Sequence, residues 1–95
     1  MKVLLSIKPE YAFKIFDGSK RYEFRKNIFR RKNIDKVVVY ASSPVQKVIG
    51  EFEIVDILHE KTELLWEITQ QYSGISKEFY DQYFEDRDHA FAIKV

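Results

Sequence analysis

The sequence contains no cysteine and few residues that break regular structure, with three glycines and two prolines among 95 residues. The lack of thiols excludes a disulfide framework, a cysteine nucleophile and any metal site with cysteine ligands. Gly18, Gly50 and Gly74 are isolated from one another, so they form neither a phosphate-binding Walker loop nor a dinucleotide-binding fingerprint. These absences argue against nucleoside triphosphate and dinucleotide chemistry.

Histidines and long apolar runs are also scarce. The two histidines, His59 and His89, are thirty residues apart and do not match the helical zinc pattern, so we expect no metal, no cofactor and two exposed side chains at the ends of elements. No window approaches the ~18 apolar residues of a membrane span, and the apolar run at the N-terminus is too short for a signal peptide. We therefore expect a cytoplasmic protein without a membrane association.

Apolar residues are present in sufficient number for a core. They make up 45% of the chain, with aromatics at 16%, and these fractions are typical of a globular domain. A chain of this length forms one small core, so we predict a single domain over residues 1–95.

The net charge of +1 hides an uneven distribution of charged residues along the chain. Residues 18–36 contain eight Lys or Arg and two acids, whereas the rest of the chain contains eight basic and thirteen acidic residues. A basic segment on an otherwise acidic protein suits an anionic ligand, although a solvated connection would have the same composition.

The first third of the chain predicts a strand, a helix and a second strand. Apolar and polar residues alternate over residues 2–8, Pro9 fits the first turn of a helix of about nine residues, and Gly18 fits its end. Alternation resumes from Lys20 to Arg25, which places Tyr22 and Phe24 on one face and Glu23 and Arg25 on the other.

The remainder predicts three strands and two helices. Residues 36–41 and 90–95 read as strands, and residues 47–58 read as one long strand that bends near Gly50. Two helices follow His59, one ending at Ser73 and Gly74 and one capped by Ser76. The order βαβββααβ predicts an α+β fold, a small open β-barrel of about five strands with about three helices packed around it.

Gly18, Lys20, Glu23 and Arg25 spell G-x-K-x-x-E-x-R. This pattern resembles the signature of the ASCH domain, a group within the PUA-like superfamily of small β-barrels. The segments around it, "LLSIKPEYAFKIFDG", "VVVYASSPV", "VIGEFEI" and "LWEITQQYSGISKEFYDQYF", look like those of short stand-alone prokaryotic and viral ASCH proteins. The end at Val95 fits either a compact version or a trimmed chain.

The resemblance implies a pseudo-barrel with a cleft beside the first helix and second strand, and a role in recognition of RNA or a modified nucleotide. In such a cleft Arg25 offers a planar fork to a phosphate or a base edge, Lys20 offers a point charge, and Glu23 orients Arg25 or accepts from an exocyclic amino group. The expected ligand-binding residues are Lys8, Lys20, Glu23, Arg25, Lys26, Arg30, Tyr40, Ser42 and Ser43.

Several residues have two readings. Ser42 and Ser43 form either a capped turn or a phosphate contact, and Trp66 is either a platform at the rim of the cleft or a partly covered edge of the core. Tyr11, Phe16, Tyr22 and Phe24 are read as packing. The face that carries Ala90 and Ala92 leaves room for a dimer contact, so a monomer and a homodimer both remain open.

The sequence favours an RNA- or modified-nucleotide-binding domain, with a regulatory role in transcription or translation. The alternative is a hydrolase of RNA or of modified nucleosides that uses Lys20, with Glu23 and Tyr40 as further catalytic candidates. In the amidohydrolases that the resemblance implies, a Thr nucleophile stands at the motif's acidic position. Glu23 occupies that position here, which argues against this route and leaves the enzyme question open.

Overall fold

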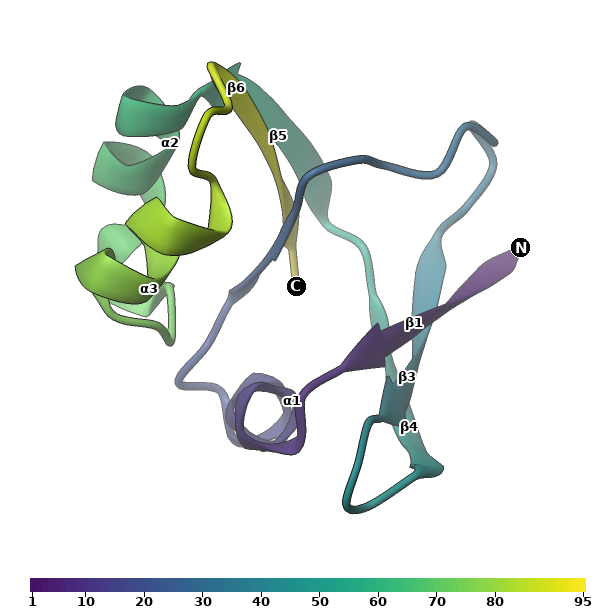
Figure 1. The fold of residues 1–95 in the computed structure, drawn as a ribbon. Coiled ribbons are helices and arrows are strands. Elements are labelled where there is room, and N and C mark those ends of the chain that lie inside the picture. Colours follow the sequence, from purple (N-terminus) through teal and green to yellow (C-terminus); the bar gives the residue numbers. More distant parts are fainter.

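The computed structural model describes residues 1–95 as an α+β fold with six strands and three α-helices (Figure 1). The elements in chain order are β1 (Lys2–Ile7), α1 (Pro9–Asp17), β2 (Tyr22–Arg25), β3 (Lys36–Ala41), β4 (Lys47–Glu53), β5 (Asp56–Lys61), α2 (Thr62–Thr69), a 3₁₀ turn (Gln70–Tyr72), α3 (Lys77–Tyr83) and β6 (His89–Lys94). None of these helices has the length and apolar character needed to cross a membrane.

The strands form two three-stranded sheets. The first sheet has the order β1-β3-β4, with β1 parallel to β3, and the second has the antiparallel order β2-β6-β5. The chain passes between the sheets at Ile54 and Val55, whose N–H groups donate to the carbonyls of Asp35 at 2.9 Å and Lys94 at 2.8 Å. The sheets are therefore joined on one side, while β1 and β2 are left as edge strands.

The strand count differs from the prediction, whereas an irregularity near Gly50 is present as predicted, because the register of β3 against β4 shifts between the pairs Val39–Gly50 and Tyr40–Val48. The segment read as one bent strand over residues 47–58 is two strands, β4 and β5, which belong to different sheets, so there are six strands in the order βαββββααβ and they close no barrel. The chain leaves the first sheet at Ile54 and Val55. Alternation of apolar and polar residues does not reveal this break, because it does not show which strand each half pairs with. Gly50 also accommodates the ring of Phe16, which lies 2.9 Å from where a Cβ would be.

Two hydrophobic cores lie on opposite faces of the second sheet. The first core joins both sheets to α1, and its buried members are Ile7, Ala12, Ile15, Val37, Val39, Phe52 and Ile93. The second core lies under α2 and α3 and contains Phe24, Leu65, Tyr80, Phe84, Ala90 and Ala92. The face of β6 that carries Ala90 and Ala92 is fully buried in the second core, so it is interior packing and the expected room for a dimer contact there is absent.

The predicted ends of α1 and the predicted cap of α3 are confirmed, whereas α2 ends at Thr69 and a 3₁₀ turn carries the helical path on to Tyr72. Pro9 begins α1, and Gly18 ends it with φ 88°, where its N–H donates to the carbonyl of Ile15. Ser76 caps α3, because its hydroxyl accepts from the N–H of Phe79 at 3.1 Å. Lys20, which follows α1, and Ile75, which precedes α3, both line the cavity described in the next subsection.

Candidate functional site

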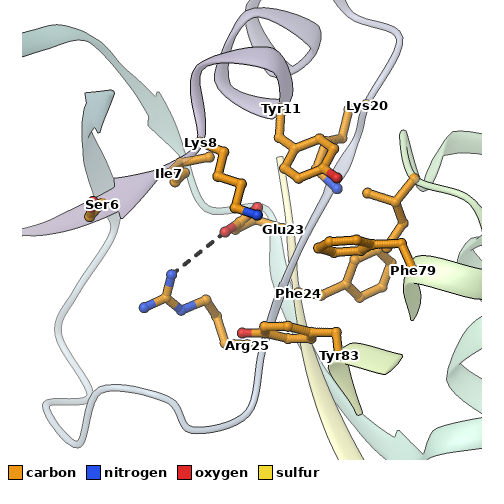
Figure 2. A pocket seen from close by; sticks show the side chains of 11 residues that line it. Ser6, Ile7, Lys8, Tyr11, Lys20, Glu23, Phe24, Arg25, Phe79 and Tyr83 are labelled. Atoms are coloured by element: carbon orange, nitrogen blue, oxygen red, sulfur yellow. Dashed lines mark ion pairs between the residues drawn. The ribbon is translucent and has the colours of Figure 1, made fainter. Parts of the chain in front are cut away.

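A cavity of about 220 Å³ lies between the two edge strands. The end of β1 forms one side and the rings of α3 the other, with the first turn of α1 and residues 23–25 of β2 between them (Figure 2). The lining residues are Ser6, Ile7, Lys8, Tyr11, Lys20, Glu23, Phe24, Arg25, Ile75, Phe79 and Tyr83. The cavity thus lies at the start of α1, where the edge strands β1 and β2 do not pair with each other.

Lys20 is the most deeply buried charged residue of the cavity, with only 2% of its surface exposed. Its ammonium donates to the carbonyl of Ser73 and lies 4.8 Å from the ring centroid of Phe24 and 5.7 Å from that of Tyr11. Burial lowers the pKa of Lys20 to about 8, partly offset by the nearby Glu23 carboxylate. The side chain predicted as a point charge past the helix end is therefore held inside the protein.

Gly74 forms the wall behind Lys20. Its φ of +68° lies in the left-handed region, and a Cβ at this position would come within 2.6 Å of Cβ and Cγ of Lys20. The Lys14 ammonium also donates to the Gly74 carbonyl at 3.3 Å. The turn after the 3₁₀ segment therefore takes glycine because the stem of Lys20 packs directly on its backbone.

Glu23 and Arg25 form an ion pair inside the cavity, as their shared strand face predicts (Figure 2). Nη1 of Arg25 lies 3.6 Å from Oε2 of Glu23, and Glu23 is 8% exposed. Burial raises the pKa of the Glu23 carboxyl, while the charges of Lys20 and Arg25 act in the opposite direction. The Arg25 side chain is 30% exposed, so its guanidinium has N–H groups available to a ligand.

Aromatic rings line the side of the cavity formed by α1 and α3. The rings of Phe79 and Tyr83 are nearly parallel with centroids 6.2 Å apart, and Tyr11 lies 5.4 Å from Phe79. Lys8 and Lys26 lie over this wall, with their ammonium groups 5.5 Å from the Phe79 centroid and 5.0 Å from the Tyr83 centroid. Both lysines are predicted ligand-binding residues; Lys8 lines the cavity, whereas Lys26 lies outside the lining and contacts it only through the ring of Tyr83.

Phe79 and Tyr83 line the cavity but are not among the predicted site residues, and Tyr11 and Phe24 line it in addition to their predicted packing. Tyr80 on α3 and Phe84 directly after that helix are buried in the second core, whereas Phe79 and Tyr83 line the cavity. The available signal is the helical spacing: two aromatic pairs, each four residues apart and offset by one, cannot all enter a single core.

Five of the nine predicted ligand-binding residues, Lys26 among them, lie outside the cavity lining. Arg30 is exposed on the loop between β2 and β3. Tyr40 pairs in register with Ser6, and the N–H of Ser42 donates to the carbonyl of Ile7 at 3.0 Å, so both are one strand away from the cavity. Their role and that of Ser43 in ligand binding stays a prediction.

Trp66 and the histidines lie elsewhere. The indole of Trp66 packs 4.9 Å from the ring of Tyr80 and lines a separate cavity of about 240 Å³ between α2 and α3, which matches its reading as a partly covered core edge. His59 and His89 are exposed on neighbouring strands with ring centroids 5.6 Å apart. No group of three or more His, Cys, Asp or Glu side chains is placed to hold a metal ion.

Comparison with known proteins gives the same family as the motif. The model of the ASCH domain matches residues 5–95. The chain is 31% identical over 92 residues to an ASCH domain-containing ribonuclease of Zymomonas mobilis, covering 97% of this chain and 62% of that protein. The crystal structure of ASCH from Zymomonas mobilis superposes with a TM-score of 0.89 at 31% identity, over 96% of this chain and 64% of that one.

A second kind of relative is a ribosomal protein. The chain is 31% identical over 96 residues to the large ribosomal subunit protein uL22 of Ureaplasma parvum serovar 3, covering 96% of this chain and 29% of that protein. The chain therefore spans less than two thirds of the length of each of these relatives.

Proposed function

The chain belongs to the ASCH domain family, and we propose that it binds RNA or a modified nucleotide through the cavity between β1 and β2. The observation that carries the proposal is the meeting of an ion-paired Arg25, a buried Glu23 and a wall of aromatic rings in one cavity. The relative named as a ribonuclease supports an RNA-related role.

The chemistry of the cavity suits a single nucleobase with its phosphate. A volume of about 220 Å³ is below the usual range for drug-sized ligands, so it favours one ring system. The Glu23 carboxylate accepts from an exocyclic amino group, and the fork of Arg25 contacts a phosphate or base edge. Phe79 and Tyr83 provide a flat apolar wall for the face of the base.

The loop between β2 and β3 supplies attraction to the RNA backbone. Its basic residues from Lys26 to Lys32 are exposed to solvent. Exposed cations neutralise phosphates and release counterions, which gives affinity with little choice of sequence. Arg30 therefore contributes to binding without contacting the cavity.

The test is titration of fluorescein-labelled single-stranded RNA of eight nucleotides, followed by anisotropy at several salt concentrations. We expect binding that weakens as salt rises, and about tenfold or more weakening in Glu23→Gln, since the variant loses the charge that orients Arg25. The matched control is Glu53→Gln, which removes an exposed carboxylate on β4. Equal affinities of both variants and the native protein would contradict the proposal.

RNA cleavage is a second candidate function, favoured by the buried amine of Lys20. A Lys with a pKa of about 8 donates a proton readily near neutral pH. In such a reaction the 2′-oxygen attacks the adjacent phosphorus and passes its proton to the Glu23 carboxylate. The bond from phosphorus to the 5′-oxygen then breaks, and Lys20 protonates the leaving oxygen. The products are a 2′,3′-cyclic phosphate and a free 5′-hydroxyl.

Cleavage is tested by incubating 5′-labelled RNA with the purified protein and identifying the products by mass spectrometry. We expect fragments that end in a cyclic phosphate, and their loss in Lys20→Ala but not in Lys47→Ala, which removes an exposed lysine from β4. Intact RNA after incubation with the native protein would rule out the cleavage function and leave the binding proposal standing.

A further inference from the structure

The inner face of the second sheet continues past the cavity into an uncovered aromatic surface. In strand register, Glu23 and Ile57 flank Ile93, and Arg25 and His59 flank Phe91. Because residues two apart on a strand point to the same face, these two rows share the face that looks into the first core and the cavity. The next row along β6 and β5 is the pair His89 and Lys61.

The second row is built around two stacked rings. The imidazole of His59 lies parallel to the ring of Phe91, with centroids 4.1 Å apart and an interplanar angle of 12°. His89 lies 5.6 Å from His59, both histidines are exposed, and Phe91 is half-buried. Neither hydrophobic core includes Phe91, so its ring and the imidazoles form a surface directly beside Arg25.

The charges on this face favour an anion. Arg25 and Lys61 are cationic, and the strand alternation turns Glu60 to the opposite face, where it pairs in register with the buried Ala90. Glu23 is the carboxylate of this face, and it is already paired with Arg25. A cross-strand stack of His59 on Phe91 also stabilises the sheet, but that role alone requires no cationic neighbours.

We propose that Phe91 and His59 form a stacking platform for the base of the nucleotide next to the one held in the cavity, with Arg25 contacting the phosphate that links them. This inference rests on the proposed RNA-binding function. Single-stranded nucleic acids bind in this way on sheets that combine rings with a positive track. Two residues along a strand span about 7 Å, roughly twice the rise between stacked bases, so the platform selects an unstacked strand.

The experiment compares a mononucleotide with a trinucleotide of the same base, for all four bases, by isothermal titration calorimetry. We expect the trinucleotide to bind the native protein roughly tenfold tighter, because stacking of one base contributes that much or more. His59→Ala is expected to remove most of this gain while leaving mononucleotide affinity unchanged. His59→Phe keeps a ring and is expected to retain the gain.

The matched control is Phe13→Ala, which removes an exposed ring from α1 outside the cavity lining and is expected to keep the native ratio. Circular dichroism melting of each variant verifies that the sheet is intact. A trinucleotide advantage that survives in His59→Ala overturns the platform while the cavity proposal stands. Absence of any nucleotide or RNA binding by the native protein overturns both, and loss of the advantage in His59→Ala alone supports the platform.

Discussion

Two cationic regions of this chain are adjacent in sequence and opposite in environment. Lys20 and Arg25 belong to the cavity, where the first is 2% exposed and the side chain of the second is 30% exposed. Arg30, Arg31 and Lys32 follow within a few residues and are exposed on the loop before β3. Both regions are rich in Lys and Arg, so burial is what distinguishes them.

Under the proposed function, this difference gives one basic segment two purposes. A buried cation is held in one geometry by its carbonyl, carboxylate and ring neighbours, so it discriminates between ligands. An exposed cation has free side-chain rotation and acts at long range through a screened potential, so it attracts any phosphate chain. The following variants separate the two contributions, in order of decreasing effect.

The largest effect is expected from Gly74→Val, which places a branched side chain against the buried stem of Lys20. The left-handed backbone and the close contact with the stem of Lys20 together predict a loss of about 3–5 kcal/mol in the free energy of unfolding. The measurement is urea denaturation followed by tryptophan fluorescence. Gly18→Ala is the control, because that position also has positive φ but nothing within 4 Å of a new Cβ, and a loss of only about 1–2 kcal/mol is expected.

The next largest effect is the pH dependence of stability that Lys20 produces. Its pKa falls from 10.5 to about 8 on folding, so between these values the unfolded chain holds a proton that the folded protein has released. The free energy of unfolding due to Lys20 therefore rises with pH across this window, by up to about 3 kcal/mol. Denaturation at pH 7 and pH 9.5 should show about 2 kcal/mol of this rise in the native protein and not in Lys20→Met. A parallel response of both proteins would show that Lys20 is not buried as a charge.

A smaller effect is expected from Arg25→Ala on RNA affinity. Removing the guanidinium leaves Glu23 without its ion-pair partner and takes away a forked contact, so we expect roughly 30-fold weaker binding of the eight-nucleotide RNA. Anisotropy titration measures it, with Arg31→Ala as the control for the loss of one exposed cation. Equal losses in the two variants would mean that the cavity has no special role.

The smallest effect is expected from Arg30→Ala combined with Lys32→Ala. Two lost phosphate contacts lower the slope of log affinity against log salt by about 1.4, since each contact on a single strand contributes roughly 0.7. The affinity at low salt falls only severalfold, and the preference among RNA sequences is expected to stay the same. A changed preference among RNA sequences would indicate that the loop, and not the cavity, recognises the bases.

Much of the local structure follows from the sequence. Pro9 and Gly18 bound α1, and alternation places Glu23 and Arg25 on one strand face, as the structure has them. The motif also predicts the family, and the match of the ASCH domain model to residues 5–95 confirms it. These features depend on neighbours a few residues apart, and short-range sterics and periodicity are visible in the chain itself.

Other features depend on contacts between residues that are far apart in the sequence. Which strands pair decides that residues 47–58 split between two sheets, and which face of α3 meets the second core decides that Phe79 and Tyr83 are free to line the cavity. The sequence by itself determined the helix ends, the strand faces and the charges of the motif. Only the tertiary structure decided that Lys20 is buried against Ser73 and Gly74, because burial arises from contacts made more than fifty residues along the chain.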